Sequence, residues 1–161
     1  MKLQDQSQPY NLDDTDKEIL SILQQDPDIS YADLGSKVGK APSSVHNRVK
    51  KMIDAGVIKK QTYVRPFKVG LNTIALIGLS VDPNRMNEIA EKIATLKRVQ
   101  MVGTTTGDHD IVFRVVVKND KALWRFINEK IKTIPGVSNK MDVSSFIDFF
   151  KMEHSINFED L

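Results

Sequence analysis

The feature that most constrains the fold is a change of hydrophobic period that recurs through residues 72–150. β-branched apolar runs, typical of strands, alternate with segments whose apolar residues recur at helical spacing. The predicted order is strand, helix, strand, strand, helix, strand, over residues 72–81, 83–96, 99–106, 111–117, 120–134 and 137–150. Two βαβ halves joined by a turn predict a ferredoxin-like α+β domain, an antiparallel sheet with both helices on one face.

The second face of such a sheet must be covered or wet. We expect the apolar residues left for it, Ile77 and Phe113 among them, to meet a partner subunit. The strand at 99–106 is expected to alternate, with Val99, Met101 and Gly103 on one side and Gln100, Val102 and Thr104 on the other. We expect four aromatic residues to lie in the core or the subunit interface and not to form a platform for stacking bases: Trp124, Phe146, Phe149 and Phe150.

The chain before residue 57 carries the start and stop signals of three short helices. Asp13 and Ser30 are suited to cap the first two, and Pro42 is suited to the first turn of the third. Gly39 and Gly56 are suited to end the second and third helices. The second and third helices are joined tightly, which predicts a helix–turn–helix.

The third predicted helix has one apolar side, formed by Val45, Val49, Met52 and Ile53. Its opposite surface carries hydroxyl, amide, imidazole and cationic groups, with Arg48 at the edge and the rest from Ser43, Ser44, His46, Asn47, Lys50 and Lys51. Small donors and amides reach base edges in a major groove, while Lys and Arg hold phosphates or guanine. The alternative is an amphipathic helix with a solvated basic face.

The charge distribution favours a polyanion-binding surface within one segment. Residues 1–36 hold two bases and eight acids, a net charge of −6, whereas residues 37–68 hold nine bases and one acid, a net charge of +8. The bases continue past Gly56, where a small hairpin or extended arm with Lys59 and Lys60 would form a wing that adds backbone contacts. A solvated basic face explains the charge alone equally well.

Several classes of protein are disfavoured by what the sequence lacks. It contains no cysteine, which excludes disulfides and thiolate chemistry. No nucleotide-binding or nucleophile motif is present, and the histidines at 46, 109 and 154 fall on separate predicted elements, so we expect no catalytic residues, no metal site and no cofactor. No apolar stretch suits a signal peptide or a membrane span, so we expect a soluble, cytoplasmic protein that is associated with the nucleoid.

The predicted domain organisation has four parts. Residues 1–11 form a flexible N-terminal arm, residues 12–64 a winged helix–turn–helix DNA-binding domain, residues 65–71 a linker, and residues 72–161 a ligand-binding and oligomerisation domain.

Three stretches together resemble the Lrp/AsnC family, the feast/famine transcription regulators: "LDDTDKEILSILQQDPDISYADLGSKVGKAPSSVHNRVKKMIDAGVIKK", "TTTGDHDIVFRV" and "IPGV". The resemblance spans residues 12 to 150 and includes the D-x-x-D-x-x-I-L opening and the G-D-x-D turn. It implies a C-terminal domain of the RAM type whose sheets pair face to face into homo-dimers, which assemble further to tetramers or octamers. One departure is Ala41, which stands where members carry a capping residue such as Ser.

The resemblance also implies an amino-acid effector, of an identity the sequence does not give, bound between C-terminal domains. The residues carried over are Thr104, Thr106, Gly107, Asp108 and Asp110, with Asp142 or Ser144 contributed from a neighbouring subunit. Physically, a carboxylate such as Asp108 accepts an ammonium, and glycine lets backbone N–H groups approach a ligand carboxylate. The alternative is a plain hairpin in which Gly107 adopts positive φ and Asp108 bonds its own backbone.

The favoured function is a sequence-specific transcription regulator that binds double-stranded DNA as a dimer and responds to an amino acid. A second hypothesis is an architectural, nucleoid-like protein that binds DNA with little sequence preference. A third is a metabolic enzyme or its regulatory subunit, against which the charge step and the missing catalytic groups argue.

Overall fold

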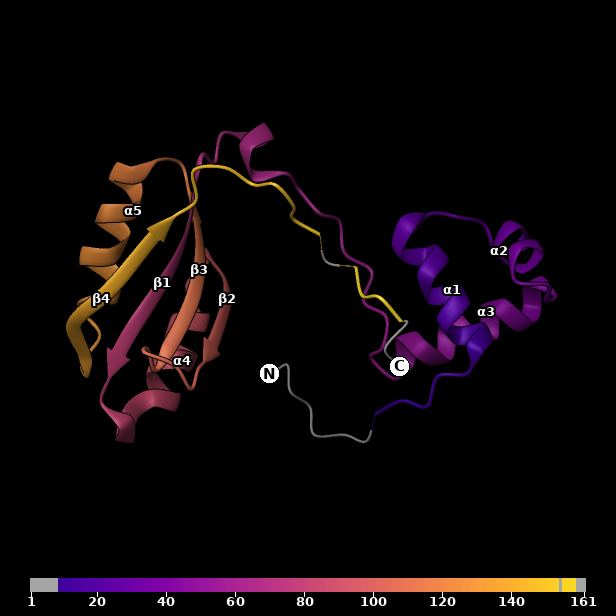
Figure 1. Cartoon of the computed structure of the whole chain (residues 1–161), viewed down its shortest axis with the longest axis horizontal. Coiled ribbons are helices and arrows are strands. Elements are labelled where there is room, and N and C mark those ends of the chain that lie inside the picture. Colours follow the sequence, from indigo (N-terminus) through magenta and orange to yellow (C-terminus); the bar gives the residue numbers. More distant parts are fainter. Residues whose placement is uncertain (1–8, 154, 159–161) are drawn as a thin grey trace. The chain divides into compact units, whose positions relative to one another are not determined.

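The computed structural model describes residues 9–153 and 155–158 (Figure 1). The chain divides into two compact units. The sheet unit is Tyr63–Met152, and the helical unit combines the described parts of Met1–Thr62 and Glu153–Leu161. Each unit is described by itself.

The helical unit contains α1 (Asp14–Gln25), α2 (Tyr31–Lys37) and α3 (Pro42–Asp54). The predicted start signals are confirmed, because the side chains of Asp13 and Ser30 accept the N–H groups of Asp16 and Asp33 respectively. Both predicted helix stops adopt the left-handed conformation that glycine favours, with φ of 63° at Gly39 and 76° at Gly56. The helix–turn–helix predicted from these signals is therefore confirmed.

The core of the helical unit joins all three helices. Its buried apolar residues are Ile19, Leu20, Leu34, Val38, Val45, Val49 and Met52. Ile53, predicted on the same apolar side of α3, is instead 39% exposed. The core thus holds α3 by the stripe 45, 49 and 52, which leaves the opposite surface of the helix outside.

The segment after α3 runs without a strand from residue 57 to residue 65 and ends in a short 3-10 helix, η1 (Pro66–Val69). Of the two forms expected for the wing, this segment has that of an arm. Its start is bonded to the last turns of α3, because the N–H groups of Val57 and Ile58 both donate to the carbonyl of Met52.

The described residues after 152 belong to the helical unit, whereas the expected domain 72–161 included them with the sheet. The Gln24 side chain exchanges two hydrogen bonds with the backbone of Ile156, at 3.1 and 2.6 Å, and Phe158 packs on the helical core. These contacts hold the tail. At the other side of this boundary, Tyr63 and Met152 meet within the sheet unit, where the Tyr63 hydroxyl lies 3.8 Å from the Met152 sulfur.

The sheet unit has the predicted βαββαβ order: β1 (Thr73–Val81), α4 (Met86–Ala94), β2 (Val99–Thr104), β3 (Ile111–Val117), α5 (Asp120–Phe126) and β4 (Val137–Ser145). A 3-10 turn, η2 (Pro83–Arg85), leads into α4, and a π-helical turn, η3 (Ile127–Ile131), continues α5. The strand order is β2-β3-β1-β4 and every pair is antiparallel, so the ferredoxin-like prediction is confirmed (Figure 1).

The core of the sheet unit lies between α4, α5 and one face of the sheet. It takes alternate residues of the central strands: Ala75, Ile77, Leu79 and Val81 of β1, and Ile111, Phe113, Val115 and Val117 of β3. The expectation that Ile77 and Phe113 face a partner is therefore wrong, because both are fully buried beneath the helices. The open face instead carries the other parity, including Gly78, Val112 and Arg114.

The alternation predicted for β2 is confirmed from Met101 to Thr104 but is wrong at Val99. The β2–β3 register shifts between Val99 and Met101, so Val99 and Val102 both pack against the core while Met101 lies opposite Arg114 on the open face. Such a shift adds one residue to a strand and reverses the faces beyond it.

The aromatic residues expected in core and interface are largely on the surface. Trp124 is 69% exposed on α5, and Phe150 is fully exposed. Phe149 stacks on Phe146 with ring centroids 4.7 Å apart, and its ring lies 5.9 Å from that of Phe67 in η1.

Candidate nucleic-acid interface and ligand turn

The outward surface of α3 gathers the polar side chains predicted to contact DNA. Most are exposed, namely Ser43, His46, Asn47, Lys50 and Lys51, while Ser44 and Arg48 are half-buried. The His46 ring contacts the Tyr31 ring of α2 edge-on, with centroids 5.0 Å apart. Lys59 and Lys60 are exposed on the arm that follows. The surface therefore offers donors and cations without an acid of its own until Asp54.

The start of α3 lacks a side-chain cap, as expected from Ala41. This residue has the extended backbone of an N-cap, with φ −61° and ψ 142°, but contributes no side-chain hydrogen bond, and Pro42 follows it in the first turn. No acidic residue stands in that turn. The positive end of the helix dipole is consequently not offset by a carboxylate of the first turn.

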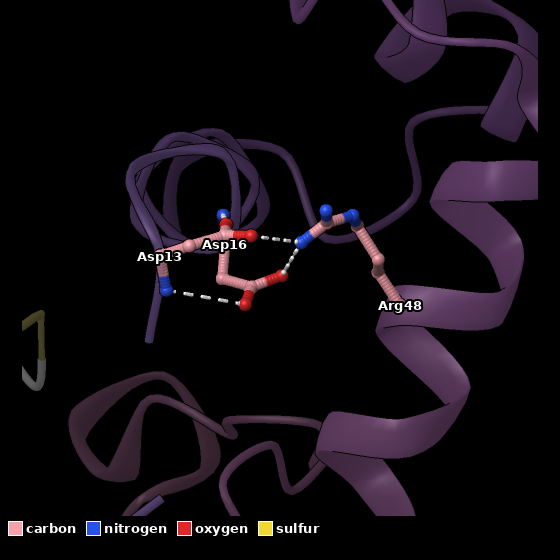
Figure 2. Close-up of polar contacts among 3 residues, drawn as sticks. All are labelled: Asp13, Asp16 and Arg48. Carbon is pink, nitrogen blue, oxygen red and sulfur yellow. Dashed lines mark hydrogen bonds and ion pairs between the residues drawn. The ribbon is translucent and has the colours of Figure 1, made fainter. Parts of the chain in front are cut away.

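Arg48 is bound within the helical unit. Its Nη1 donates to Asp13 Oδ2 at 2.7 Å and to Asp16 Oδ1 at 2.8 Å; Asp13 is the N-cap of α1 and Asp16 lies in its first turn (Figure 2). The side chain of Asp16 is 8% exposed and that of Arg48 is 32% exposed. The guanidinium of Arg48 lowers the pKa of Asp13, and its bonds to Asp16 and Asp13 raise the pKa of Arg48. We call these three residues the Arg48 cluster.

A shallow hollow of about 280 Å³ adjoins this cluster on the outward side of α3. It is lined by Tyr10, Asp16, Ser44, Asn47, Arg48 and Lys51. Polar groups predicted for DNA contact therefore share one concave surface with a residue that precedes α1.

The turn between β2 and β3 gives its two carboxylates different surroundings. Asp110 Oδ2 accepts the N–H of Val81 at 2.9 Å, and the Asp110 N–H donates to Leu79 at 2.9 Å. These bonds fall where the β1–β4 register shifts between Leu79 and Val81. Asp110, predicted to line the effector site, thus supports the irregular end of β1, whereas Asp108 is exposed.

His109 lies in this turn and was not among the residues predicted for the effector site. Its Nε2 lies 2.9 Å from Oδ2 of Asp142 on β4, its ring covers Gly78 of β1, and its Nδ1 is buried without a hydrogen-bond partner. Gly78 is the signal that could have been read, because a glycine inside an apolar strand indicates the close approach of another group. Asp142, expected to act from a neighbouring subunit, here contacts its own chain.

The remaining residues predicted for the effector are exposed: Thr104, Thr106, Gly107 and Ser144. Gly107 does not have the positive φ that the hairpin alternative required; among the described residues, positive φ occurs at Gly39, Gly56, Gly70 and Gly136. The Thr105 hydroxyl donates to the carbonyl of His109 and closes the turn.

Metal and membrane features were sought in the described residues. No group of three or more His, Asp or Glu side chains there is arranged to hold a metal ion, and His154 lies outside the described residues. None of the helices between residues 9 and 158 combines the length and apolar character needed to cross a bilayer.

Two family models match the chain. One, described as winged helix-turn-helix DNA-binding, matches residues 12–59. The other, described as Lrp/AsnC ligand binding domain, matches residues 74–147.

Two regulators of known sequence are similar over most of the chain. An HTH-type transcriptional regulator of Pyrococcus furiosus is 40% identical over 129 residues, which cover 80% of this chain and 87% of that protein. The transcriptional regulator AzlB of Bacillus subtilis is 34% identical over 154 residues, which cover 93% of this chain and 98% of AzlB.

Solved structures share the fold. AsnC of E. coli superposes with a TM-score of 0.84 at 27% identity, over 89% of this chain and 97% of AsnC. A transcriptional regulator of Neisseria meningitidis, in complex with L-Met, gives a TM-score of 0.87 at 23% identity, over 93% of this chain and 99% of its own.

Proposed function

Because the chain belongs to the Lrp/AsnC family of transcription regulators, with a DNA-binding and a ligand-binding domain and no enzymatic activity, we propose that it binds specific duplex sequences through α3. The observation that carries this proposal is the rotation of α3. Its stripe of Val45, Val49 and Met52 is buried, so the polar surface faces outward.

The polar surface divides by chemistry. Ser43, Ser44, His46 and Asn47 stand in the first half of α3, the part of a recognition helix that meets base edges in a major groove. The lysines at 50, 51, 59 and 60 stand further along and serve as phosphate contacts, which fix register without reading sequence.

An amino acid is the proposed effector, bound between sheet units near the β2–β3 turn. The exposed Asp108 carboxylate suits an ammonium group, and the exposed hydroxyls of Thr104, Thr106 and Ser144 suit a carboxylate. The Neisseria relative of the same fold was solved with L-Met, which supports an amino acid as the ligand class. We place Gly107, Asp110 and Asp142 at the margin of this site, since Asp110 and Asp142 already have partners within the chain.

The proposed assembly is a homo-dimer that pairs through the open face of the sheet and grows to a tetramer or octamer. Met101 on that face is 48% exposed, and Leu76 and Val112 are half-buried. We further propose that residues 12–64 act as the DNA-binding domain and residues 72–152 as the ligand-binding domain, joined by 65–71, with the described tail after residue 152 belonging to the helical unit. Such a regulator works in the cytoplasm, on the nucleoid.

Selection from a pool of randomised duplexes with the purified protein tests the proposal. We expect enrichment of an imperfect palindrome whose half-sites lie about 10 base pairs apart. Asn47→Ala is expected to change the enriched sequence. Lys59→Ala is expected to weaken all duplexes alike and to lower the salt slope by about 1, whereas Lys97→Ala, a control on the sheet unit, leaves both unchanged.

An architectural protein of the same fold is the competing function. It would retain no preferred sequence in the same selection, and Asn47→Ala would then act like a lysine variant. Binding of no duplex at low salt by the unaltered protein would reject both functions.

A further inference from the structure

We propose that Arg48 is a positioning residue, which fixes the recognition helix α3 on α1 instead of contacting DNA. The inference rests on the proposed function, in which α3 is the helix that enters the groove. It reverses the expectation from sequence, where a cation on this helix was counted among the DNA contacts.

In the Arg48 cluster, every oxygen of the two carboxylates has a hydrogen-bond donor. Asp13 and Asp16 form a capping box, in which Asp13 Oδ1 accepts the Asp16 N–H at 2.8 Å and Asp16 Oδ2 accepts the Asp13 N–H at 3.4 Å. Each carboxylate then has one oxygen left, and both of these oxygens accept from the same Nη1 of Arg48. All four carboxylate oxygens thereby have a hydrogen-bond partner, and Figure 2 shows the two bonds to Arg48.

The charges of the cluster oppose a role in phosphate binding. One guanidinium stands between two carboxylates, so the three side chains together carry a net charge of −1. A phosphate that approached Arg48 would meet this negative group, and binding through Nη1 would displace the bond to Asp16, whose side chain is 8% exposed. Leaving a buried carboxylate without its partner is costly, so the guanidinium stays with α1.

The position of Arg48 along α3 explains how the cluster affects recognition. Asn47 precedes Arg48 directly, and Lys51 follows it by three residues, one turn away on the same side. Both line the hollow beside the cluster. The apolar stripe holds α3 against the core, and the Arg48 bonds add a directional restraint that sets where Asn47 and Lys51 point.

Asp16→Asn gives the sharpest test, because two models predict opposite signs. The variant keeps the shape of the side chain but removes one negative charge near the interface. If Arg48 binds DNA, freeing it and removing the acid strengthens binding. If Arg48 positions α3, the variant weakens binding to the enriched duplex by about threefold or more. Asp14→Asn, with the same charge change on the same turn, is the matched control, and we expect it to bind at least as tightly as the unaltered protein.

Arg48 variants supply the second readout. Arg48→Gln is expected to weaken the enriched duplex more than random duplexes, because the orientation of Asn47 is no longer fixed, and to leave the salt slope unchanged, whereas loss of a phosphate contact weakens all duplexes alike and lowers the slope by about 1. The double variant with Asp16→Asn should lose little more than either single variant, and Arg48→Lys should recover part of the loss. All affinities are measured where circular dichroism shows the variants folded.

The outcomes separate the two proposals. Tighter binding by Asp16→Asn, a lower salt slope for Arg48→Gln, or equal weakening of all duplexes by Arg48→Gln overturns the positioning role while the proposed function stands. If Arg48→Gln does not fold, the change in DNA affinity of Asp16→Asn and of Arg48→Lys still decides between the two models. Failure of the unaltered protein to enrich any sequence counts against the proposed function itself.

Discussion

The imidazole of His109 lies directly against Gly78, so close that a β-carbon at residue 78 would overlap the ring. The ring is held there by Asp142, 2.9 Å from its Nε2. Three elements of the sheet unit thus meet at one point of the open face: β1 supplies the space, the β2–β3 turn the ring and β4 the carboxylate. Only glycine provides that space.

Gly78→Ala is expected to displace the His109 ring and to lower the free energy of unfolding by about 1–3 kcal/mol, the usual cost of overpacking. The imidazole resonances of His109 in a nitrogen-15 correlation spectrum report the displacement directly. Gly103→Ala is the matched control, since it adds a methyl group on the same face where nothing lies within 4 Å. Unchanged His109 resonances in Gly78→Ala would contradict the contact.

We expect Asp110 to contribute to the stability of the fold and Asp108 to contribute to amino-acid binding. Asp110→Ala leaves the Val81 N–H without its acceptor, which is expected to cost about 1–3 kcal/mol of unfolding free energy, whereas Asp110→Asn retains an acceptor and costs less. Asp108→Ala should stay within about 0.5 kcal/mol in urea unfolding, as exposed positions do, and should instead weaken amino-acid binding in calorimetry. Equal unfolding midpoints for Asp110→Ala and Asp108→Ala would refute this division.

A serine at the start of α3 should stabilise the helical unit. Ala41→Ser places a hydroxyl where the backbone already has N-cap geometry and the side-chain bond is missing, so we expect a gain of about 0.5–1 kcal/mol in urea unfolding. Ala55→Ser, at the C-cap of the same helix, serves as the control and should bring no such gain. A loss of stability in Ala41→Ser would mean that the uncapped start is favoured by the fold.

The Arg48 cluster predicts a loss of stability in acid. Arg48 lowers the pKa of Asp13 in the folded chain, so this carboxylate stabilises the fold above its unfolded pKa, and the stabilisation is lost as pH falls through the folded pKa. The difference in unfolding free energy between the unaltered protein and Asp13→Asn should therefore shrink below about pH 4. Arg85 lowers the pKa of Glu88 in the sheet unit, which adds the same trend to both proteins and cancels in the difference. A difference that stays constant down to about pH 2 would contradict the prediction.

Local signals made most of the fold predictable. The Ser30 cap, the Pro42 first turn and the Gly39 stop each depend on backbone atoms within a few residues, so they can be predicted from neighbouring residues in the sequence. The outward face of α3 followed from the spacing of Val45, Val49 and Met52. The order of strands and helices followed from hydrophobic period in the same way.

Contacts between distant residues could not be predicted from these signals. In the sequence, Arg48 is a cation on the predicted recognition helix, which is typical of a DNA contact. Its two carboxylate partners lie 32 and 35 residues earlier, at the start of α1, and only the folded structure brings them together. The faces of Ile77 and Phe113 depended on which side the helices cover, and the β2 register depended on one shift that hydrophobic alternation does not reveal.

The meeting of Tyr63 and Met152 makes the sheet unit an insertion within the chain of the helical unit. Insertions whose two ends lie together are readily transplanted between hosts, provided that both junctions are cut. A chimaera joined only near residue 62 would leave Ile156 and Phe158 facing a foreign α1, without the Gln24 bonds that receive them. A chimaera that combines the sheet unit of this chain with another helical unit therefore requires two junctions, one before Tyr63 and one after Met152.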